Sequence, residues 1–454
     1  MAPSYQGSPR RGLSCRGMTP HVATFATRCD GPYHVGMQDD SQDTANVTAK
    51  GSMPAPPWVG LAESAGLLDA QGSLSSTIFE EMSALANRHD AINLGQGFPD
   101  TDGPAVLADA LSRAVAQGRN QYATIAGNPT LRSEIAIHEE IAGRRRPDPD
   151  TEITVTAGAT EALTATMMAY LRPGDEVILF EPFYDLYPAI AGLTGARIVT
   201  VPLLPPTFAP DLERLRDAFS DRTRMVLVND PHNPTGAVFG HETMQLIADL
   251  AERHDSIILT DSVYEHMVFN GNPVDLGSLE SARHRTVRVS SASKTFSITG
   301  WRVGWAIAPP ELTRGLRATK GYLSHSAAAP LQVAVSEAMA WAREQSFYTE
   351  LNDQYLQQRE VLLNGLDGGA FRARRPEGTF FAVASTESVP ETWGRDGLEI
   401  SRSLAERAGV AVVPLQAFAT APHRTLYASW IRFAFCKRPD VLQQSAERLQ
   451  RAGL

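Results

Sequence analysis

The chain has 454 residues, of which 43% are hydrophobic, and its 41 basic and 51 acidic residues give a formal charge of −10. This length allows one large and one smaller lobe, each with its own core. The charge argues against nucleic acid as the main partner, and no apolar run reaches the roughly 18 residues of a membrane span. Cys15, Cys29 and Cys436 form neither a disulfide framework nor a zinc pattern, so we expect a soluble, cytoplasmic protein.

Residues 1–60 differ from the rest of the chain, because Gly, Ser, Pro and Thr recur there without apolar periodicity. We predict that this segment is a disordered extension. Its first charged residues are arginines and no acid precedes Asp30, as in organellar transit peptides, yet it lacks a convincing amphipathic helix. It is therefore either a targeting segment or, as we favour, a dispensable extension or the result of a start codon placed too early, with Met37 or Met53 as the true start.

From Ser73 onward, short apolar runs alternate with helix-like stretches. The predicted buried strands are Ile153–Thr156, Glu176–Phe180, Arg197–Val201, Met225–Val228, Ile257–Thr260 and Val287–Val289. The predicted helices between them include Ala159–Leu171, Asp185–Leu193 and His241–His254. Helical crossovers between buried strands predict an α/β fold, in which a large, mainly parallel sheet is covered by helices on both faces.

After residue 325 the sequence becomes more helical, with shorter strands expected near Thr379–Val383 and Val410–Pro414. This change predicts a smaller α+β domain at the C-terminus. We divide the chain into residues 61–100, an N-terminal segment of the small domain; residues 101–325, the large domain; and residues 326–454, the small C-terminal domain.

Glycine and polar residues come shortly after several predicted strands. Gly158 follows the first strand, Tyr184 the second, Asn233 the fourth, Asp261 the fifth and Lys294 the sixth. The carboxyl ends of parallel strands share one edge of a sheet, which is where such folds bind ligands. We therefore expect these residues to meet in one cleft.

Three short motifs in this region have a common chemical meaning. They are Asn233–Gly236 (NPTG), Asp261–Tyr264 (DSVY) and Ser291–Lys294 (SASK), and Arg302 follows eight residues after the last. Pyridoxal phosphate needs an amine for its aldehyde, a carboxylate for its ring nitrogen, donors for its phenolic oxygen and cations for its phosphate. Each need has a candidate in this ordered set, which predicts that the large domain binds this cofactor.

Lys294 is the predicted amine, because its segment is poor in charge and follows a buried strand, where a desolvated lysine is easily neutral. Once freed, the amine can carry a proton between substrate and cofactor as general base and then acid. Asp261 ends an apolar strand, where a carboxylate is costly unless a group such as a pyridinium N–H pairs with it. A solvated loop lysine, and a helix cap or ion pair at Asp261, are alternatives that the combined motif disfavours.

The predicted phosphate site combines backbone donors with positive charge. Its candidate residues are Gly158, Ala159, Thr160, Ser291, Ser293 and Arg302. The first three lie between a strand and a helix, where free N–H groups and the helix dipole favour an anion. Arg302 can bind two oxygens at once. Plain helix capping remains the alternative for Thr160.

The ordered motifs resemble those of the class I aminotransferases, fold type I enzymes that depend on pyridoxal phosphate, from about Ser73 to the C-terminus. The chain is most similar to kynurenine, glutamine and methionine aminotransferases and to actinobacterial succinyl-diaminopimelate aminotransferases. Besides the three motifs, this likeness rests on Asn93–Asp100 (NLGQGFPD), Glu181–Asp185 (EPFYD) and Arg432–Lys437 (RFAFCK).

The resemblance implies cofactor-binding roles for individual residues. It makes Lys294 the Schiff-base lysine, and Asn233 and Tyr264 donors to the phenolic oxygen. Tyr184 would stack on the cofactor ring. The family places a serine three residues before the lysine, which favours Ser291 over Ser293 as a phosphate ligand. For Asn233 the alternative is ordinary turn chemistry.

The resemblance also implies a substrate site and a homodimer. Arg432 would bind the substrate α-carboxylate, with Asn233 and the Gly97 backbone beside it, although a surface ion pair is the alternative for Arg432. Tyr122 matches a tyrosine that reaches the phosphate of the neighbouring subunit. Relatives carry a bulky aromatic residue and histidine where this chain has Ala327–Ala329, which weakens the case for kynurenine as substrate.

The expected activity is transfer of an α-amino group from an amino acid to a 2-oxo acid by a ping-pong mechanism. β-Elimination from cysteine conjugates is the alternative with the same cofactor, and a non-catalytic, cofactor-binding homologue or regulator is the alternative from another class. No metal is predicted, because no histidine has metal-ligand companions at useful spacing. The sequence does not indicate which amino donor and acceptor are used.

Overall fold

The computed structural model describes residues 55–69, 71–270 and 273–454. The predicted N-terminal extension, residues 1–60, lies almost wholly outside these ranges. Helix α1 (Pro57–Ser64) begins inside the last few residues of that prediction. Within the described ranges, no helix combines the length and the apolar character needed to cross a bilayer.

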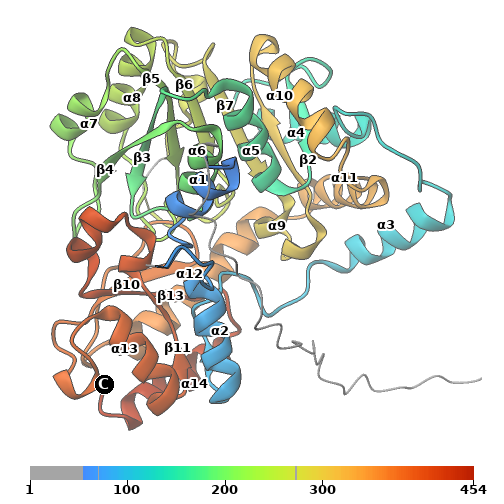
Figure 1. Cartoon of the computed structure of the whole chain (residues 1–454). Coiled ribbons are helices and arrows are strands. Elements are labelled where there is room, and N and C mark those ends of the chain that lie inside the picture. Colours follow the sequence, from blue (N-terminus) through green and yellow to red (C-terminus); the bar gives the residue numbers. More distant parts are fainter. Residues whose placement is uncertain (1–54, 70, 271–272) are drawn as a thin grey trace, which may run out of the picture. The chain divides into compact units, whose positions relative to one another are not determined.

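A seven-stranded sheet forms the scaffold of the larger part of the structure (Figure 1). In spatial order its strands are β2 (Ile153–Thr156), β8 (Gly304–Ile307), β7 (Thr286–Ser291), β6 (Ile257–Asp261), β5 (Thr223–Asn229), β3 (Glu176–Glu181) and β4 (Arg197–Pro202). All neighbours pair in parallel except β8, which is antiparallel to both β2 and β7. The prediction of a large, mainly parallel sheet is therefore confirmed.

Helices cover both faces of this sheet, because successive strand residues point to opposite sides and both sides are apolar. On one face, Val177 and Leu179 share a core with α5 (Gly158–Tyr170), α6 (Leu186–Thr194) and α10 (Pro310–Leu323). On the other face, Ile178 and Phe180 share a core with α7 (Leu212–Ala218) and α8 (His241–Arg253). A further core joins β2 to α3 (Ala105–Ala116), α4 (Pro129–Ile141) and α11 (Ala329–Glu344).

The C-terminal elements, in orange and red in Figure 1, form a smaller α+β region. Its four-stranded sheet has the order β12 (Val413–Pro414), β13 (Trp430–Ala434), β10 (Phe381–Ser385) and β9 (Arg372–Ala373). Its helices are α12 (Phe347–Leu366), α13 (Gly397–Ser403) and α14 (Pro439–Arg451). From the N-terminal side, α2 (Ile78–Arg88) packs on this region and β1 (Ile92–Asn93) pairs with β11 (Val410–Ala411). The proposed domain boundaries stay a prediction.

Three differences from the predicted elements have local causes. The strand expected at Thr379 begins at Phe381, because Thr379 adopts a φ of 65°, outside the extended region. The run predicted as one strand at Val410–Pro414 forms two short strands in different sheets. Four strands, β1, β8, β9 and β13, were not predicted; β8 is only four residues long and begins with glycine, which is rare in strands.

Candidate active site

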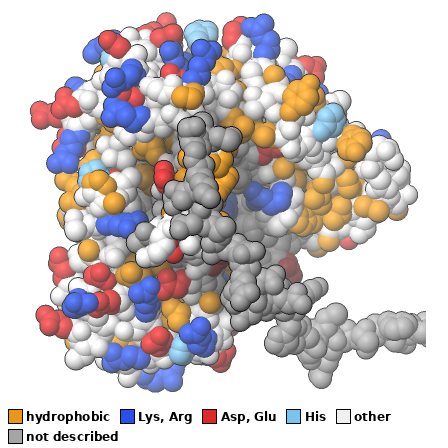
Figure 2. Space-filling view, viewed as in Figure 1, with side chains coloured by type: hydrophobic (Ala, Val, Ile, Leu, Met, Phe, Trp, Pro, Cys, Tyr) orange, Lys and Arg blue, Asp and Glu red, His pale blue; other side chains and the backbone are white. Residues whose placement is uncertain are grey.

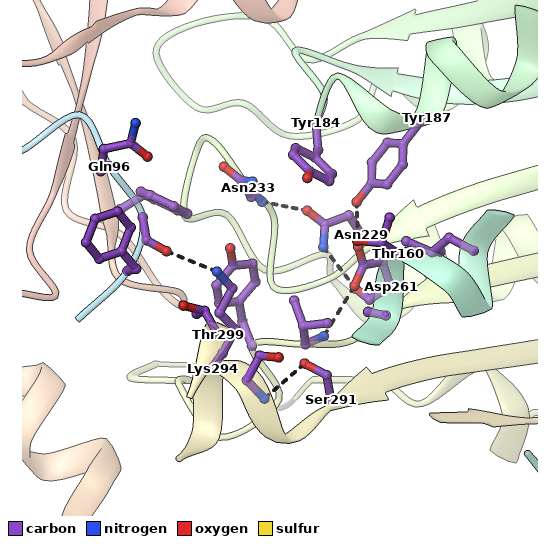
Figure 3. Close-up of a pocket in the computed structure, with 18 of the residues that line it drawn as sticks. Gln96, Thr160, Tyr184, Tyr187, Asn229, Asn233, Asp261, Ser291, Lys294 and Thr299 are labelled. Atoms are coloured by element: carbon purple, nitrogen blue, oxygen red, sulfur yellow. Dashed lines mark hydrogen bonds between the residues drawn. The ribbon is translucent and has the colours of Figure 1, made fainter. Parts of the chain in front are cut away.

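The carboxyl ends of the parallel strands border a cavity of about 430 Å³ (Figure 3). Two elements of the small region, β10 and β13, contribute to its wall. Twelve of the predicted site residues line this cavity: Gly97, Ala159, Thr160, Tyr184, Asn233, Asp261, Tyr264, Ser291, Ser293, Lys294, Arg302 and Arg432. The other two, Gly158 and Tyr122, do not line it. The fold thus brings together residues that lie more than 300 positions apart in the chain.

Lys294 enters the cavity from α9 (Ala292–Thr295), the short helix that follows β7. The Ser291 side chain caps this helix by accepting a hydrogen bond from the Ser293 N–H, at 3.3 Å. The Lys294 ammonium donates to the Gly97 carbonyl oxygen, at 3.0 Å. Burial is the largest influence on this group and lowers the pKa of Lys294 to about 8, so a substantial fraction of the amine is neutral near neutral pH.

Asp261 ends β6 and is 5% exposed. Its carboxylate accepts hydrogen bonds from the Tyr187 hydroxyl, at 2.7 Å, and from the Val263 N–H, at 3.4 Å. It forms no ion pair with any residue that the structure describes. Burial raises the pKa of Asp261 above its usual value, because the charged form lacks a close positive partner. A cationic group of a ligand would relieve this cost.

A chain of amide hydrogen bonds holds the Asn233 loop at the cavity (Figure 3). The Asn233 N–H donates to Asn229 Oδ1 at 2.7 Å, and Asn229 Nδ2 donates to the Asp261 carbonyl at 2.9 Å. Tyr264, three residues after Asp261, packs edge-on against Phe380 and is 4% exposed. Burial raises the pKa of Tyr264 well above its ordinary value, so its phenol stays protonated and can donate a hydrogen bond.

The end of the cavity near α5 is suited to an anion. Arg302 donates to Thr160 Oγ1 and to the Thr299 carbonyl, both at 3.1 Å. Gly158 lies directly beneath this arginine with a φ of 76°, and a β-carbon built there would overlap the guanidinium. Gly158 therefore makes room for Arg302 instead of lining the cavity. The nearby Ser293 hydroxyl is buried without a hydrogen-bond partner among the described residues.

Arg432 on β13 provides a second positive charge, from the small region. It is 1% exposed, and its Nη atoms donate to Asn233 Oδ1 at 2.9 Å and to the Gly95 carbonyl at 2.7 Å. Its guanidinium lies 4.0 Å from the centre of the Phe381 ring. Burial lowers the pKa of Arg432 to about 10, so it remains charged at neutral pH. Its Nε has no partner in the described chain, and neither does its charge, which suits an anionic ligand.

The two predicted aromatic contacts differ in position. Tyr184 lines the cavity and packs edge-on against Tyr187, and burial raises its pKa to about 12. Tyr122 is 86% exposed and contacts the His325 ring edge-on instead. Ala327, by contrast, is buried in the core around β2 and does not line this cavity.

Several lining residues were not predicted: Phe79, Gln96, Phe98, Leu163, Tyr187, Asn229, Val263, Thr299 and Phe381. Two of them carried a usable signal. Tyr187 lies three residues after Tyr184, in the first turn of the helix predicted to begin at Asp185, and so close to the same strand end. Asn229 is a polar residue at the end of a buried strand, the same signal that identified Asp261. The rest reach the cavity only through the tertiary arrangement.

Comparisons with known proteins agree with this geometry. Residues 89–449 match the family model "Aminotransferase class I and II". The chain is 41% identical over 390 residues to a probable N-succinyldiaminopimelate aminotransferase from Mycobacterium tuberculosis, covering 83% of this chain and 96% of that protein. It is 39% identical over 381 residues to a methionine aminotransferase from Escherichia coli, covering 83% and 96%.

Solved structures show the same relationship. A structure from Escherichia coli described as having a methionine aminotransferase function superposes with a TM-score of 0.81 at 36% identity, covering 88% of this chain and all of that one. The N-succinyldiaminopimelate aminotransferase of Mycobacterium tuberculosis gives a TM-score of 0.78 at 41% identity, covering 83% and 97%. The chain therefore belongs to the class I and II aminotransferases, with the fold and the enzymatic activity of that family.

Proposed function

We propose that the cavity binds pyridoxal phosphate and that Lys294 is the residue to which its aldehyde attaches. The observation that carries this proposal is the position of three groups in one cavity: a lysine amine of lowered pKa, the unpaired carboxylate of Asp261 and the guanidinium of Arg302. These are the amine, the carboxylate and the cation that the cofactor requires.

The unsatisfied groups of the cavity support this fit. The buried Asp261 carboxylate would pair with the protonated ring nitrogen, and the unpartnered Ser293 hydroxyl is a free donor near Arg302. Helix α5 has no side-chain cap at Ala157, the residue before it, and the N–H groups of Ala159 and Thr160 at this end suit a phosphate. Gly158 contributes the space that Arg302 needs above this helix end.

When bound, pyridoxal phosphate supplies an aldehyde that condenses with amines and a protonated ring that draws electrons from the substrate α-carbon. Asp261 keeps the ring nitrogen protonated by providing a negative charge in a buried setting. Lys294 Nζ would take the proton from the substrate α-carbon as general base and would then give it to the cofactor as general acid. The first of these roles needs an amine that is neutral at working pH. Tyr264 and Asn233 donate to the phenolic oxygen, and Tyr184 covers the ring.

The substrate α-carboxylate is assigned to Arg432. Its remaining N–H donors are free, its charge has no carboxylate partner among the described residues, and Asn233 fixes its orientation. Gly97, whose carbonyl accepts from Lys294, lies next to the same site. A bidentate contact here places the α-carbon of any amino acid at a constant distance from Lys294.

We extend the proposal to amino donors with uncharged, apolar side chains, as the name of the relative called methionine aminotransferase suggests. Lys294, Arg302 and Arg432 are the cations by which the described chain lines the cavity, and each has a role above. Among the described residues that line the cavity, no further cation is left for a side-chain carboxylate, whereas Phe79 and Phe98 provide apolar wall. Single-turnover spectra with methionine, aspartate and glutamate would test this, and a preference for the acidic donors would contradict it.

We also propose that the active unit is a homodimer. Hydrophobic side chains gather over α3 and α11 in Figure 2, and the exposed apolar residues nearby include Val115 on α3 and Tyr322 on α10. Tyr122 belongs to the same exposed set and is free to reach a partner's cavity. Sedimentation velocity would reveal a monomer if this is wrong. Cytoplasmic location stays a prediction from the sequence.

The assignment of Lys294 is tested by borohydride reduction of the cofactor-loaded enzyme, followed by peptide mass mapping. The expected result is one labelled peptide, with the added mass on Lys294, and loss of both label and turnover in Lys294→Ala. A label on another residue, or turnover in the variant, would overturn the assignment. Pyruvate and ammonia release from a cysteine conjugate without a 2-oxo acid would reveal β-elimination, which no finding so far favours.

A further inference from the structure

A buried group of charges lies beside the cavity but outside it. It consists of Glu139, Arg144, Glu265 and Arg288, which we call the rear cluster, and all four side chains are largely or fully buried. Each glutamate contacts both arginines: Glu139 accepts from Arg144 at 2.6 Å and from Arg288 at 2.7 Å, and Glu265 accepts from them at 2.8 and 2.5 Å. The two pairs of charges balance each other in a closed ring.

The rear cluster ties together segments that are distant in the chain. Glu139 comes from α4, Arg144 from the loop after it, Glu265 from the turn after β6 and Arg288 from β7. Glu265 makes one more contact with β7, because its second carboxylate oxygen accepts from the Ser290 hydroxyl at 2.5 Å. The Glu265 carboxylate is thus bonded to two residues of the neighbouring strand and to a third side chain from outside the sheet.

These contacts lie one residue away from the proposed cofactor ligands. Glu265 directly follows Tyr264, which lines the cavity, and Ser290 directly precedes Ser291, which caps the helix bearing Lys294. Tyr264 and Glu265 are neighbours in one turn, and Ser290 and Ser291 are neighbours at the end of β7, so in each segment a cavity residue and a residue of the charge network share one backbone. Movement of the Glu265 turn relative to the end of β7 would therefore move Tyr264 relative to Lys294.

A metal site is a different explanation for part of this region. His138, Glu265 and His266 place one potential ligand atom each within 4.8 Å of one another, and His138 Nε2 has no hydrogen-bond partner. However, the Glu265 oxygen nearest His138 already accepts from both arginines of the rear cluster. Its lone pairs are occupied, and two guanidinium charges would repel a divalent cation. The geometry therefore favours a structural ion-pair network.

We propose that Glu265 is a positioning residue for the reaction: through Ser290 and Arg288 it fixes the turn carrying Tyr264 against the strand that leads to Lys294. This inference rests on the proposed function of the cavity. It adds that Glu265, which lies outside the cavity, sets the distance between Tyr264, a donor to the cofactor, and Lys294, the residue that binds the cofactor. Burial by itself would raise the pKa of Glu265, but the charges of Arg288 and Arg144 hold it well below its usual range, so this network stays charged at working pH.

The test compares Glu265→Gln with a matched control, Glu176→Gln. Glu176 is also buried, and it accepts from two arginines, at 2.5 and 2.7 Å, and from Ser220 at 2.7 Å, but it lies at the amino end of β3, away from the cavity. Melting temperatures of both variants measure the loss of ion pairs. The positioning role predicts that Glu265→Gln binds pyridoxal phosphate about tenfold more weakly and lowers kcat by a similar factor, the scale known for outer contacts of a site. Glu176→Gln should match wild type in both values.

Ser290→Ala removes a single contact and keeps the ion pairs, so it serves if Glu265→Gln does not fold. It should shift the pH at which the cofactor's visible absorbance changes, and Ser290→Thr, which restores the hydroxyl, should return this pH to the wild-type value. If both Glu265→Gln and Ser290→Ala bind cofactor and titrate like wild type, the inference is wrong. If wild type carries no borohydride label on Lys294, the proposed function fails first, and the two failures are thereby distinguished.

Discussion

The hydrogen bond from Tyr187 to Asp261 offers a direct test of how the carboxylate is kept charged. The bond is 2.7 Å long, and its partners are 2% and 5% exposed, so water cannot replace it in Tyr187→Phe. A hydrogen bond to a buried charged group contributes about 1.5–3 kcal/mol. Losing it raises the pKa of Asp261 further, since this bond now opposes the effect of burial. If the lost free energy destabilises only the charged form of Asp261, kcat/KM should decrease by about 10- to 100-fold.

The assay is the pH profile of kcat/KM with a saturating 2-oxo acid, measured for wild type and Tyr187→Phe. The acidic limb of the variant should move to higher pH, because a carboxylate of raised pKa becomes charged only at higher pH. Tyr170→Phe is the control, since it removes a 2.6 Å bond to the neutral carbonyl of Leu312, outside the cavity. An unchanged acidic limb and a rate within about twofold of wild type in Tyr187→Phe would refute this account of Asp261.

Three further predictions concern the anion sites and the lysine. Gly158→Ala should weaken pyridoxal phosphate binding by about 5- to 30-fold in a fluorescence titration. The causes are backbone strain of about 1–2 kcal/mol and the overlap of the new β-carbon with Arg302. The control is Gly118→Ala, which has the same φ of 76° but open space around it and should bind the cofactor normally. Arg432→Gln should raise KM for amino acids by about 10- to 100-fold without changing cofactor affinity, and equal effects on both would contradict its assignment to the α-carboxylate. The rate of cofactor uptake by cofactor-free enzyme should rise with pH and level off above about 8, because only neutral Lys294 attacks the aldehyde. If the midpoint of this pH profile lies near the pKa of free lysine, about 10, the amine is not desolvated.

The sequence predicted the site best where a chemically suitable side chain follows directly after a predicted strand. Parallel strands bring their carboxyl ends to one edge, so Asp261 and Lys294 could be placed together from strand prediction alone. Gly158 shows the limit of that reasoning: its predicted contact with a phosphate stays a prediction, whereas its close approach to Arg302 could be found only in the structure. The sequence identified this glycine by its place between a strand and a helix, and a tertiary contact of this kind does not follow from chain position.

Residues that act through side-chain partners were harder to predict. Tyr187 and Asn229 orient predicted residues without themselves belonging to a motif. Their partners lie 74 and 4 positions away in the chain. A hydrogen bond between such residues depends on the register of neighbouring strands and the rotation of a helix, and neither follows from periodicity. The failure to predict strand β8 has the same cause, since its pairing partners β2 and β7 determine its position.

The rear cluster extends this argument to charges. Taken singly, Glu139 and Arg144 are typical of a solvated helix or loop surface, and only Arg288 lies in a run that the sequence predicts to be a buried strand. Their burial follows from mutual compensation, since a lone charge at any of these positions would be too costly to keep. Such a ring has few alternative arrangements, because moving one member breaks two of its four ion pairs at once. The turn that carries Tyr264 and the strand that leads to Lys294 are therefore held together by the same electrostatic cost that makes each of these charges, considered alone, an improbable core residue.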